Sequence, residues 1–195
     1  MVLLIPTSYP IFKREMGSHM YSSTAYFVAA TMANVLVNIF YPIIVSLLSF
    51  WWYQYPVSDL YGFLCFLLVM MTAAMCGVAF GQVIGSFART EMTALIVLMQ
   101  TLTTYYMGAG VLSNASASGS NWFGTFLQWI SPLRYLNELA LRRMLAGRLD
   151  IIQNGILEKF GFEYGVFWCS FALASYIVVC LLIGCFLMHT LSKGS

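Results

Sequence analysis

Charged residues divide this chain into long apolar stretches. The four longest stretches without Asp, Glu, Lys or Arg run over residues 16–58, 60–88, 92–133 and 164–192. Each exceeds the roughly 20 mostly apolar residues that an α-helix needs to cross a bilayer core. We expect helices, because a helix satisfies its own backbone hydrogen bonds in lipid and the alternation typical of a membrane β-barrel is absent. The predicted spans are Ala25–Phe50, Leu60–Ile84, Met92–Leu112 and Val166–His189.

The composition supports a lipid environment. Of the 195 residues, 61% are hydrophobic and 8% are charged, whereas ordinary soluble domains carry about 25% charged residues. The net charge of +2 is too small to indicate a nucleic-acid partner. The five cysteines lie inside apolar runs without a CxxC pair, so we expect buried thiols rather than disulfides or metal ligands. The predicted fold class is an all-α integral membrane protein.

Basic residues near the predicted spans indicate the orientation. The short segments outside the spans carry Lys13, Arg14, Arg89 and Lys193. The connection over residues 51–58 carries no basic residue. Because cytosolic loops are enriched in Lys and Arg, we expect both termini in the cytosol, in a plasma membrane or an endomembrane. Asn114 begins a glycosylation sequon in the long loop, and an external loop agrees with this orientation.

The long external loop, residues 113–164, has helical patterns of its own. Apolar residues recur at helical spacing from Trp122 to Ile130, which predicts a short helix in or dipping into the membrane interface. Ser131 and Pro132 end that helix and begin another. We therefore expect a structured loop rather than a linker.

The second loop helix carries a stripe of alternating charge. Arg134, Glu138 and Arg142 lie at i, i+4 and i+8, the spacing at which side chains of one helix meet. Two interpretations are open. The stripe is either the solvated face of an interfacial helix or part of an external lid that ion pairs brace.

A strip of small residues runs along the second span. Gly77, Gly81 and Gly85 recur at every fourth residue, and such a strip lets a second membrane helix approach closely. The alternative is that membrane helices simply tolerate glycine. In the third span, Thr103 and Met99 belong to a soft mixed surface, which suits a bulky amphipathic ligand or an ordinary contact between helices.

No residue pattern predicts catalysis. None of the lysines is followed by Ser or Thr, so a Walker A loop is absent. His19 and His189 are isolated and predict no metal site. There is no Gly-x-Ser-x-Gly elbow and no acid within a span. We expect no catalytic residue, no bound metal and no cofactor on this chain.

The blocks at residues 12–15, 25–27, 110–114 and 130–135 together resemble the G subfamily of ABC transporters, of the White and pleiotropic-drug-resistance type. Phe12-Lys13-Arg14-Glu15, followed by Ala25-Tyr26-Phe27, is similar to the family's cytosolic coupling segment and next span. Gly110-Val111-Leu112-Ser113-Asn114 is similar to the apolar plug of the family's cavity. Ile130-Ser131-Pro132-Leu133-Arg134-Tyr135, with Glu138 downstream, looks like a segment of its external loop. These blocks cover nearly the whole chain.

The resemblance implies part of an ABC-2 type permease, namely the last four of six spans. ATP and magnesium would bind a nucleotide-binding domain, encoded upstream in the same gene or supplied by another chain. A second transmembrane domain would complete a homodimer or heterodimer. Such a transporter would export lipids, sterols or amphipathic xenobiotics.

The same resemblance assigns roles to residues of this chain. The segments would be coupling (1–24), three spans (25–112), external loop (113–164), last span (165–190) and cytosolic tail (191–195). Phe12, Arg14 and Glu15 would touch the ATPase. Met99, Thr103 and Tyr106 would face the cavity, and Val111 and Leu112 would form the plug. Arg134 and Glu138 would brace the external loop.

Departures from the family pattern and two alternatives accompany this resemblance. Arg143-Met144 replaces the Asn-Glu pair common after the external helix, and the loop cysteines frequent in relatives are absent. Asn34 stands where relatives often carry an acid. The chain could instead be a non-transporting membrane scaffold that packs through the glycine strip. It could also be a truncated relic, for which the abrupt start at Met1 is the main argument.

Overall fold

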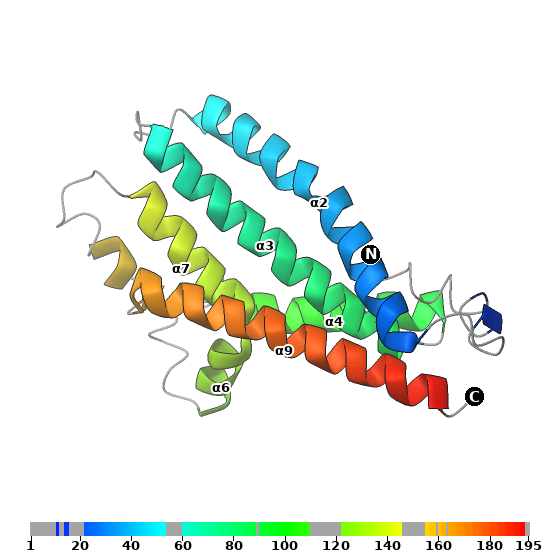
Figure 1. Ribbon diagram of the computed structural model, residues 1–195. Coiled ribbons are helices and arrows are strands. Elements are labelled where there is room, and N and C mark those ends of the chain that lie inside the picture. The colour runs from blue at the N-terminus through cyan, green and yellow to red at the C-terminus, as the bar shows by residue number, and fades with distance from the viewer. Residues whose placement is uncertain are drawn as a thin grey trace. The chain divides into compact units, whose positions relative to one another are not determined.

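The described part of the chain is helical wherever its secondary structure is regular. The computed structural model describes Ile11, Arg14, Glu15 and residues 22–53, 60–88, 90–109, 122–145, 155–158, 160–162 and 164–193. Within these residues, the helices of nine residues or more are α2 (Ser23–Tyr53), α3 (Leu60–Phe87), α4 (Glu91–Gly108), α6 (Trp122–Ile130), α7 (Pro132–Met144) and α9 (Val166–Lys193) (Figure 1). No strand occurs in this part of the chain. The predicted all-α fold class is confirmed.

Three of the helices that the structure describes are long and apolar enough to cross a bilayer. These candidate spans are Ser23–Ser49 in α2, Leu60–Phe87 in α3 and Val166–Thr190 in α9. Each agrees to within a few residues with a span predicted from the charge-free stretches. Pro42 lies inside α2, where neighbouring groups in a membrane protein can compensate for its missing N–H group.

The third predicted span, Met92–Leu112, forms a shorter helix than expected. Helix α4 has 18 residues and ends at Gly108, before a turn at Ala109. At 1.5 Å per residue it reaches about 27 Å, slightly less than a bilayer core of about 30 Å. Gln100 and four threonines also make α4 less apolar than the three candidate spans, and it is not one of them. That α4 crosses the membrane stays a prediction.

The chain divides into two compact units, and α2, α3, α4 and α9 each contribute to both. Unit 1 comprises Met1–Phe40, Ala74–Gln100 and Tyr176–Ser195. Unit 2 comprises Tyr41–Ala73 and Thr101–Ser175.

In unit 1, a glycine of α9 lets the side chain of Phe27 approach closely. Phe27 and Met188 are 4% and 1% exposed and form one apolar cluster. A Cβ atom on Gly184 would lie 2.9 Å from Cζ of Phe27, which is closer than packed carbon atoms approach. The charge-free stretches did not single out Gly184, because it belongs to no repeat.

The predicted glycine strip of α3 has mixed surroundings. Gly81 and Gly85 are buried within the chain. Gly77 is exposed, and a Cβ atom there would have no neighbour within 4 Å among the described residues. If Gly77 has a packing role, its partner must be a helix other than those described here. This role stays a prediction.

In unit 2, the end of α4 packs against the break between α6 and α7. As predicted, this break falls at Ser131 and Pro132, with Pro132 in the first turn of α7, where proline fits a helix start. The Ser131 hydroxyl donates a hydrogen bond of 2.9 Å to the carbonyl oxygen of Tyr105. A Cβ atom on Gly108 would lie 2.6 Å from the carbonyl oxygen of Leu127. Glycine at position 108 is thus a condition of this packing.

Candidate functional site

A buried ion pair lies on α7 of unit 2. Glu138 is 0% exposed, and its Oε1 accepts hydrogen bonds from Nε and Nη2 of Arg142 at 3.1 and 2.9 Å. Arg142 is 21% exposed and also donates from Nη2 to the carbonyl oxygen of Phe162 at 3.4 Å. The pair therefore connects α7 with the turn that precedes α9.

Arg134 makes a second set of contacts around the same turn. Its Nη1 donates to Oε1 of Gln128 at 2.7 Å, and its Nη2 donates to the carbonyl oxygen of Gly161 at 3.2 Å. Its guanidinium carbon lies 5.3 Å from the centroid of the Tyr164 ring, within the range of a cation–π interaction. Arg134 thus joins α6, α7 and the turn.

The turn itself depends on glycine. Gly161 has a φ angle of 68°, a left-handed conformation that side chains with a Cβ atom rarely adopt. The carbonyl groups of Gly161 and Phe162 each accept a hydrogen bond from an arginine of α7. The turn thus combines a left-handed residue, Gly161, with two successive carbonyl groups that accept hydrogen bonds from the arginines of α7.

Burial decides between the two interpretations of the charged stripe. Arg134 is 7% exposed and Glu138 is 0% exposed, so the solvated-face interpretation is wrong for both side chains. Glu138 and Arg142 pair at i, i+4 as the spacing predicts, whereas Arg134 and Glu138, at the same spacing, do not. No direct hydrogen bond joins Arg134 to Glu138 among the described residues, and each has its own partners. Sequence spacing identified the residues but could not identify Gln128 or the turn carbonyls.

The titration of Glu138 gives a testable pH dependence. Burial raises the pKa of this carboxyl above its ordinary value, and the hydrogen bond and charge of Arg142 offset part of the rise. A raised folded-state pKa means that the folded protein holds the proton more tightly than the unfolded chain. The contribution to stability is therefore fully present below the ordinary pKa and is lost as pH rises through the raised pKa.

We expect acidification to stabilise the wild-type protein relative to Glu138→Gln, which cannot titrate at this position. The measurement is the difference in melting temperature between the two detergent-solubilised proteins, at several pH values from neutral down to the ordinary glutamate pKa. The difference should move in favour of the wild type as pH falls. The opposite trend would mean that the ion pair, rather than burial, dominates the pKa.

Polar residues of the first two spans face protein in unit 1. Asn34 and Gln82 are 6% and 1% exposed. The Thr31 hydroxyl lies 2.7 Å from the carbonyl oxygen of Phe27 and 3.1 Å from Oε1 of Gln82. Helices α2 and α3 are therefore joined by a polar contact inside two candidate spans. Such groups are expected to be turned away from lipid.

The predicted cavity residues share one face of α4. Met99, Thr103 and Tyr106 stand at i, i+4 and i+7, which is one side of a helix. All three are exposed, with exposed fractions of 63% for Met99 and 56% for Tyr106. Their role as cavity residues therefore stays a prediction, and it would need a partner surface that faces this exposed side of α4.

The remaining predicted sites are only partly described. Arg14 is exposed and Glu15 is half-buried. Phe12, Val111, Leu112 and Asn114 lie outside the described residues. The coupling, plug and glycosylation roles therefore stay predictions.

Comparison with known proteins identifies the family. Residues 1–145 match the protein-family model described as ABC-2 type transporter. The chain is also 28% identical to Protein scarlet of Drosophila melanogaster over 156 residues, which are 77% of this chain and 22% of that protein. The chain thus spans about a fifth of the length of this curated relative. With three apolar helices of spanning length, it is an integral membrane protein, and it belongs to the ABC-2 type transporter family.

Proposed function

We propose that this chain is permease machinery of an ATP-driven exporter of the G-subfamily type, which moves lipids, sterols or amphipathic xenobiotics. ABC-2 type domains are the membrane transport components of ABC transporters. The observation that carries the proposal is the extent of the family match, because residues 1–145 include α2 to α4 and α7 together with the segment for which we propose a coupling role. A transmembrane domain of this type carries no ATPase site of its own, so a nucleotide-binding domain supplies ATP hydrolysis.

The exposed face of α4 supports a paired arrangement. Met99, Thr103 and Tyr106 combine a thioether, a hydroxyl and an aromatic ring on one exposed side. Adaptable side chains of this kind fit bulky amphipathic molecules of varied shape. A second transmembrane domain facing this side would enclose a substrate cavity. We also propose cytosolic termini, on the basis of the basic residues near the spans.

Glu15→Ala separates the exporter from a membrane scaffold. If Glu15 couples the permease to the ATPase, the variant loses ATP-driven transport to near background while its abundance and assembly are unchanged. The measurement is transport in membrane vesicles, with blue-native electrophoresis of the same samples. Glu91→Gln is the control, because Glu91 is also acidic but lies at the start of α4. Full transport by the Glu15→Ala protein would contradict the coupling role.

Thr103→Trp tests the cavity face. Thr103 is exposed in unit 2, so the larger ring should be accommodated without loss of folding, yet it would occupy volume where substrate passes. We expect a several-fold fall in transport with an unchanged melting temperature. Val178→Trp is the control, since Val178 is also exposed, at 56%, but lies on α9. Equal transport by both variants would argue against a cavity at Thr103.

A further inference from the structure

Two charged side chains of α7 each keep one buried polar atom that has no hydrogen-bond partner among the described residues. These atoms are Nε of Arg134 and Oε2 of Glu138. The two residues are 7% and 0% exposed, so bulk water does not reach these atoms. An unpartnered buried atom of a charged group costs more free energy than one of a neutral group. The two atoms therefore require a partner that the described side chains do not supply.

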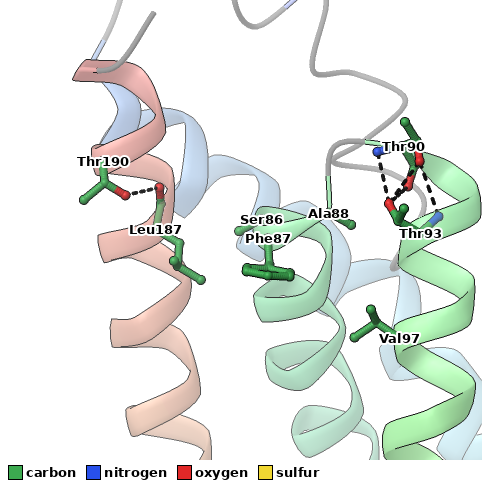
Figure 2. A pocket seen from close by; sticks show the side chains of 8 residues that line it. All are labelled: Ser86, Phe87, Ala88, Thr90, Thr93, Val97, Leu187 and Thr190. Atoms are coloured by element: carbon green, nitrogen blue, oxygen red, sulfur yellow. Dashed lines mark hydrogen bonds between the residues drawn. The ribbon is translucent and has the colours of Figure 1, made fainter.

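The pocket of about 520 Å³ in unit 1, where α3 and α9 end and α4 begins, differs in kind from this site (Figure 2). None of its described lining residues has an unpartnered buried side-chain atom. Ser86 donates to the carbonyl oxygen of Gln82, and Thr190 donates to that of Leu187, each at 2.8 Å. These hydroxyl hydrogens are used within their own helices, so they select no particular ligand.

The other polar atoms of Arg134 and Glu138 are held in place. Arg134 donates from Nη1 to Gln128 at 2.7 Å and from Nη2 to the carbonyl oxygen of Gly161 at 3.2 Å. Oε1 of Glu138 accepts two hydrogen bonds from Arg142. Hydrogen bonds of charged groups are strong, and a turn of either side chain toward the other would break them. A direct bond between Nε and Oε2 is therefore disfavoured.

Arg134 and Glu138 nevertheless lie close together. They are one turn apart on α7, and the Cβ atoms of residues at i and i+4 of a helix are about 5–6 Å apart. Burial raises the pKa of Glu138, whereas Arg142 and, to a smaller extent, Arg134 lower it, as expected of neighbouring charges. One small molecule can therefore span from Nε of Arg134 to Oε2 of Glu138.

The described residues select the kind of molecule. The Glu138 carboxylate would repel an anion, and the guanidinium groups of Arg134 and Arg142 would repel a cation. A neutral molecule that accepts one hydrogen bond and donates another suits both atoms. The buried Cys169 thiol also interacts with the carboxylate, but a thiol is a weak donor and a weak acceptor. Water is the smallest molecule with both capacities, and buried waters bond to polar groups of this kind.

We propose that one water molecule binds between Arg134 and Glu138. It accepts a hydrogen bond from Nε of Arg134 and donates one to Oε2 of Glu138. The water joins the contacts that Arg134 makes with α6 and the turn to the ion pair of Glu138 and Arg142. Arg134 and Glu138 thereby brace this segment together, although no direct bond joins them. The site goes beyond the proposed export function, because it needs neither ATP nor a second transmembrane domain.

The first test is an electron cryo-microscopy map of the wild-type protein in lipid nanodiscs, at a resolution that shows ordered water. We expect density for one water within hydrogen-bond distance of both Nε of Arg134 and Oε2 of Glu138. A direct bond between these two atoms would overturn the proposal. So would the Cys169 sulfur at the expected position of the water, or well-ordered side chains without density between them.

A double-mutant cycle gives a second test, by melting temperature of the solubilised protein. Arg134→Lys keeps the charge but places a carbon atom where arginine has Nε. Glu138→Gln keeps an oxygen for Arg142 and turns an NH2 group to the position of Oε2. Arg134→Lys should therefore lower the melting temperature by a few degrees less in the Glu138→Gln background than in the wild type. The contacts of Arg134 with Gln128 and Gly161 are lost in both backgrounds and cancel.

Arg143→Lys crossed with Glu138→Gln is the matched control, because Arg143 is a half-buried arginine of the same helix. Its effect on the melting temperature should be equal in the two backgrounds. An equal effect of Arg134→Lys in both backgrounds would overturn the proposal. The map requires no variant, so it decides the question even where a variant does not fold. Neither readout depends on transport, so failure here leaves the proposed function to its own tests.

Discussion

Glu138→Ala is expected to destabilise unit 2 by about 3 kcal/mol, because removal of one partner from a buried ion pair typically costs about 3–5 kcal/mol. The lower end of this energy range applies, because the Arg142 side chain is 21% exposed and can recover some hydration when Glu138 is removed. The substitution also leaves a void where a fully buried side chain was packed. A loss of this size removes a large part of the stability of an ordinary domain.

The measurement is the melting temperature of the solubilised protein, together with its recovery in a monodisperse peak by size-exclusion chromatography. The melting temperature of Glu138→Gln should fall much less, because glutamine keeps the side-chain volume and an acceptor for Arg142. Glu158→Ala is the matched control, since Glu158 is an exposed acid of the same segment. If Glu138→Ala and Glu158→Ala behave alike, the ion pair does not stabilise the external segment.

Gly108→Ala is expected to destabilise the protein by about 2 kcal/mol, although alanine favours helices by about 1 kcal/mol over glycine. The added methyl group would lie 2.6 Å from the carbonyl oxygen of Leu127. A backbone atom cannot turn aside as a side chain can, so α4 and α6 must separate, and overpacking of this kind costs about 1–3 kcal/mol. Separation also lengthens the bond from Ser131 to Tyr105.

Gly77→Ala provides the comparison for the same chemical change. A methyl group at Gly77 would meet no described atom within 4 Å, so its helix should keep or gain stability. The measurement is the melting temperature of both variants under identical detergent conditions. If Gly108→Ala melts at or above the wild-type temperature, the close approach of α4 to Leu127 is not a feature of the protein in solution.

The spans of this protein could be predicted from sequence because lipid imposes one simple requirement, a long charge-free helix. That requirement identified α2, α3 and α9 directly. The requirement could not decide whether α4 spans the membrane. Gln100 and the threonines lower the mean hydropathy of α4 to a level expected of a helix that packs against protein. Length and composition therefore identify the strongly apolar spans but cannot decide whether a helix of mixed polarity, such as α4, crosses the membrane.

Contacts between helices were harder to predict than the helices themselves. Spacing of four residues identifies residues on one face but does not identify what that face meets. The repeat on α3 identified Gly77, which is exposed, and Gly81 and Gly85, which are buried. It could not identify the close approaches at Gly108 and Gly184, which belong to no repeat. Likewise, the stripe on α7 could not reveal that a turn at Gly161 supplies acceptors for Arg134.

We propose that this chain is the permease part of an exporter that ATP hydrolysis drives. The most direct measurement is uptake of a fluorescent phospholipid or sterol analogue into inside-out vesicles that contain the protein with its own nucleotide-binding domain. We expect uptake that requires hydrolysable ATP and that disappears in vesicles lacking the chain. Intact, assembled protein that shows no ATP-dependent uptake across a broad panel of such amphiphiles would contradict it and favour a scaffold.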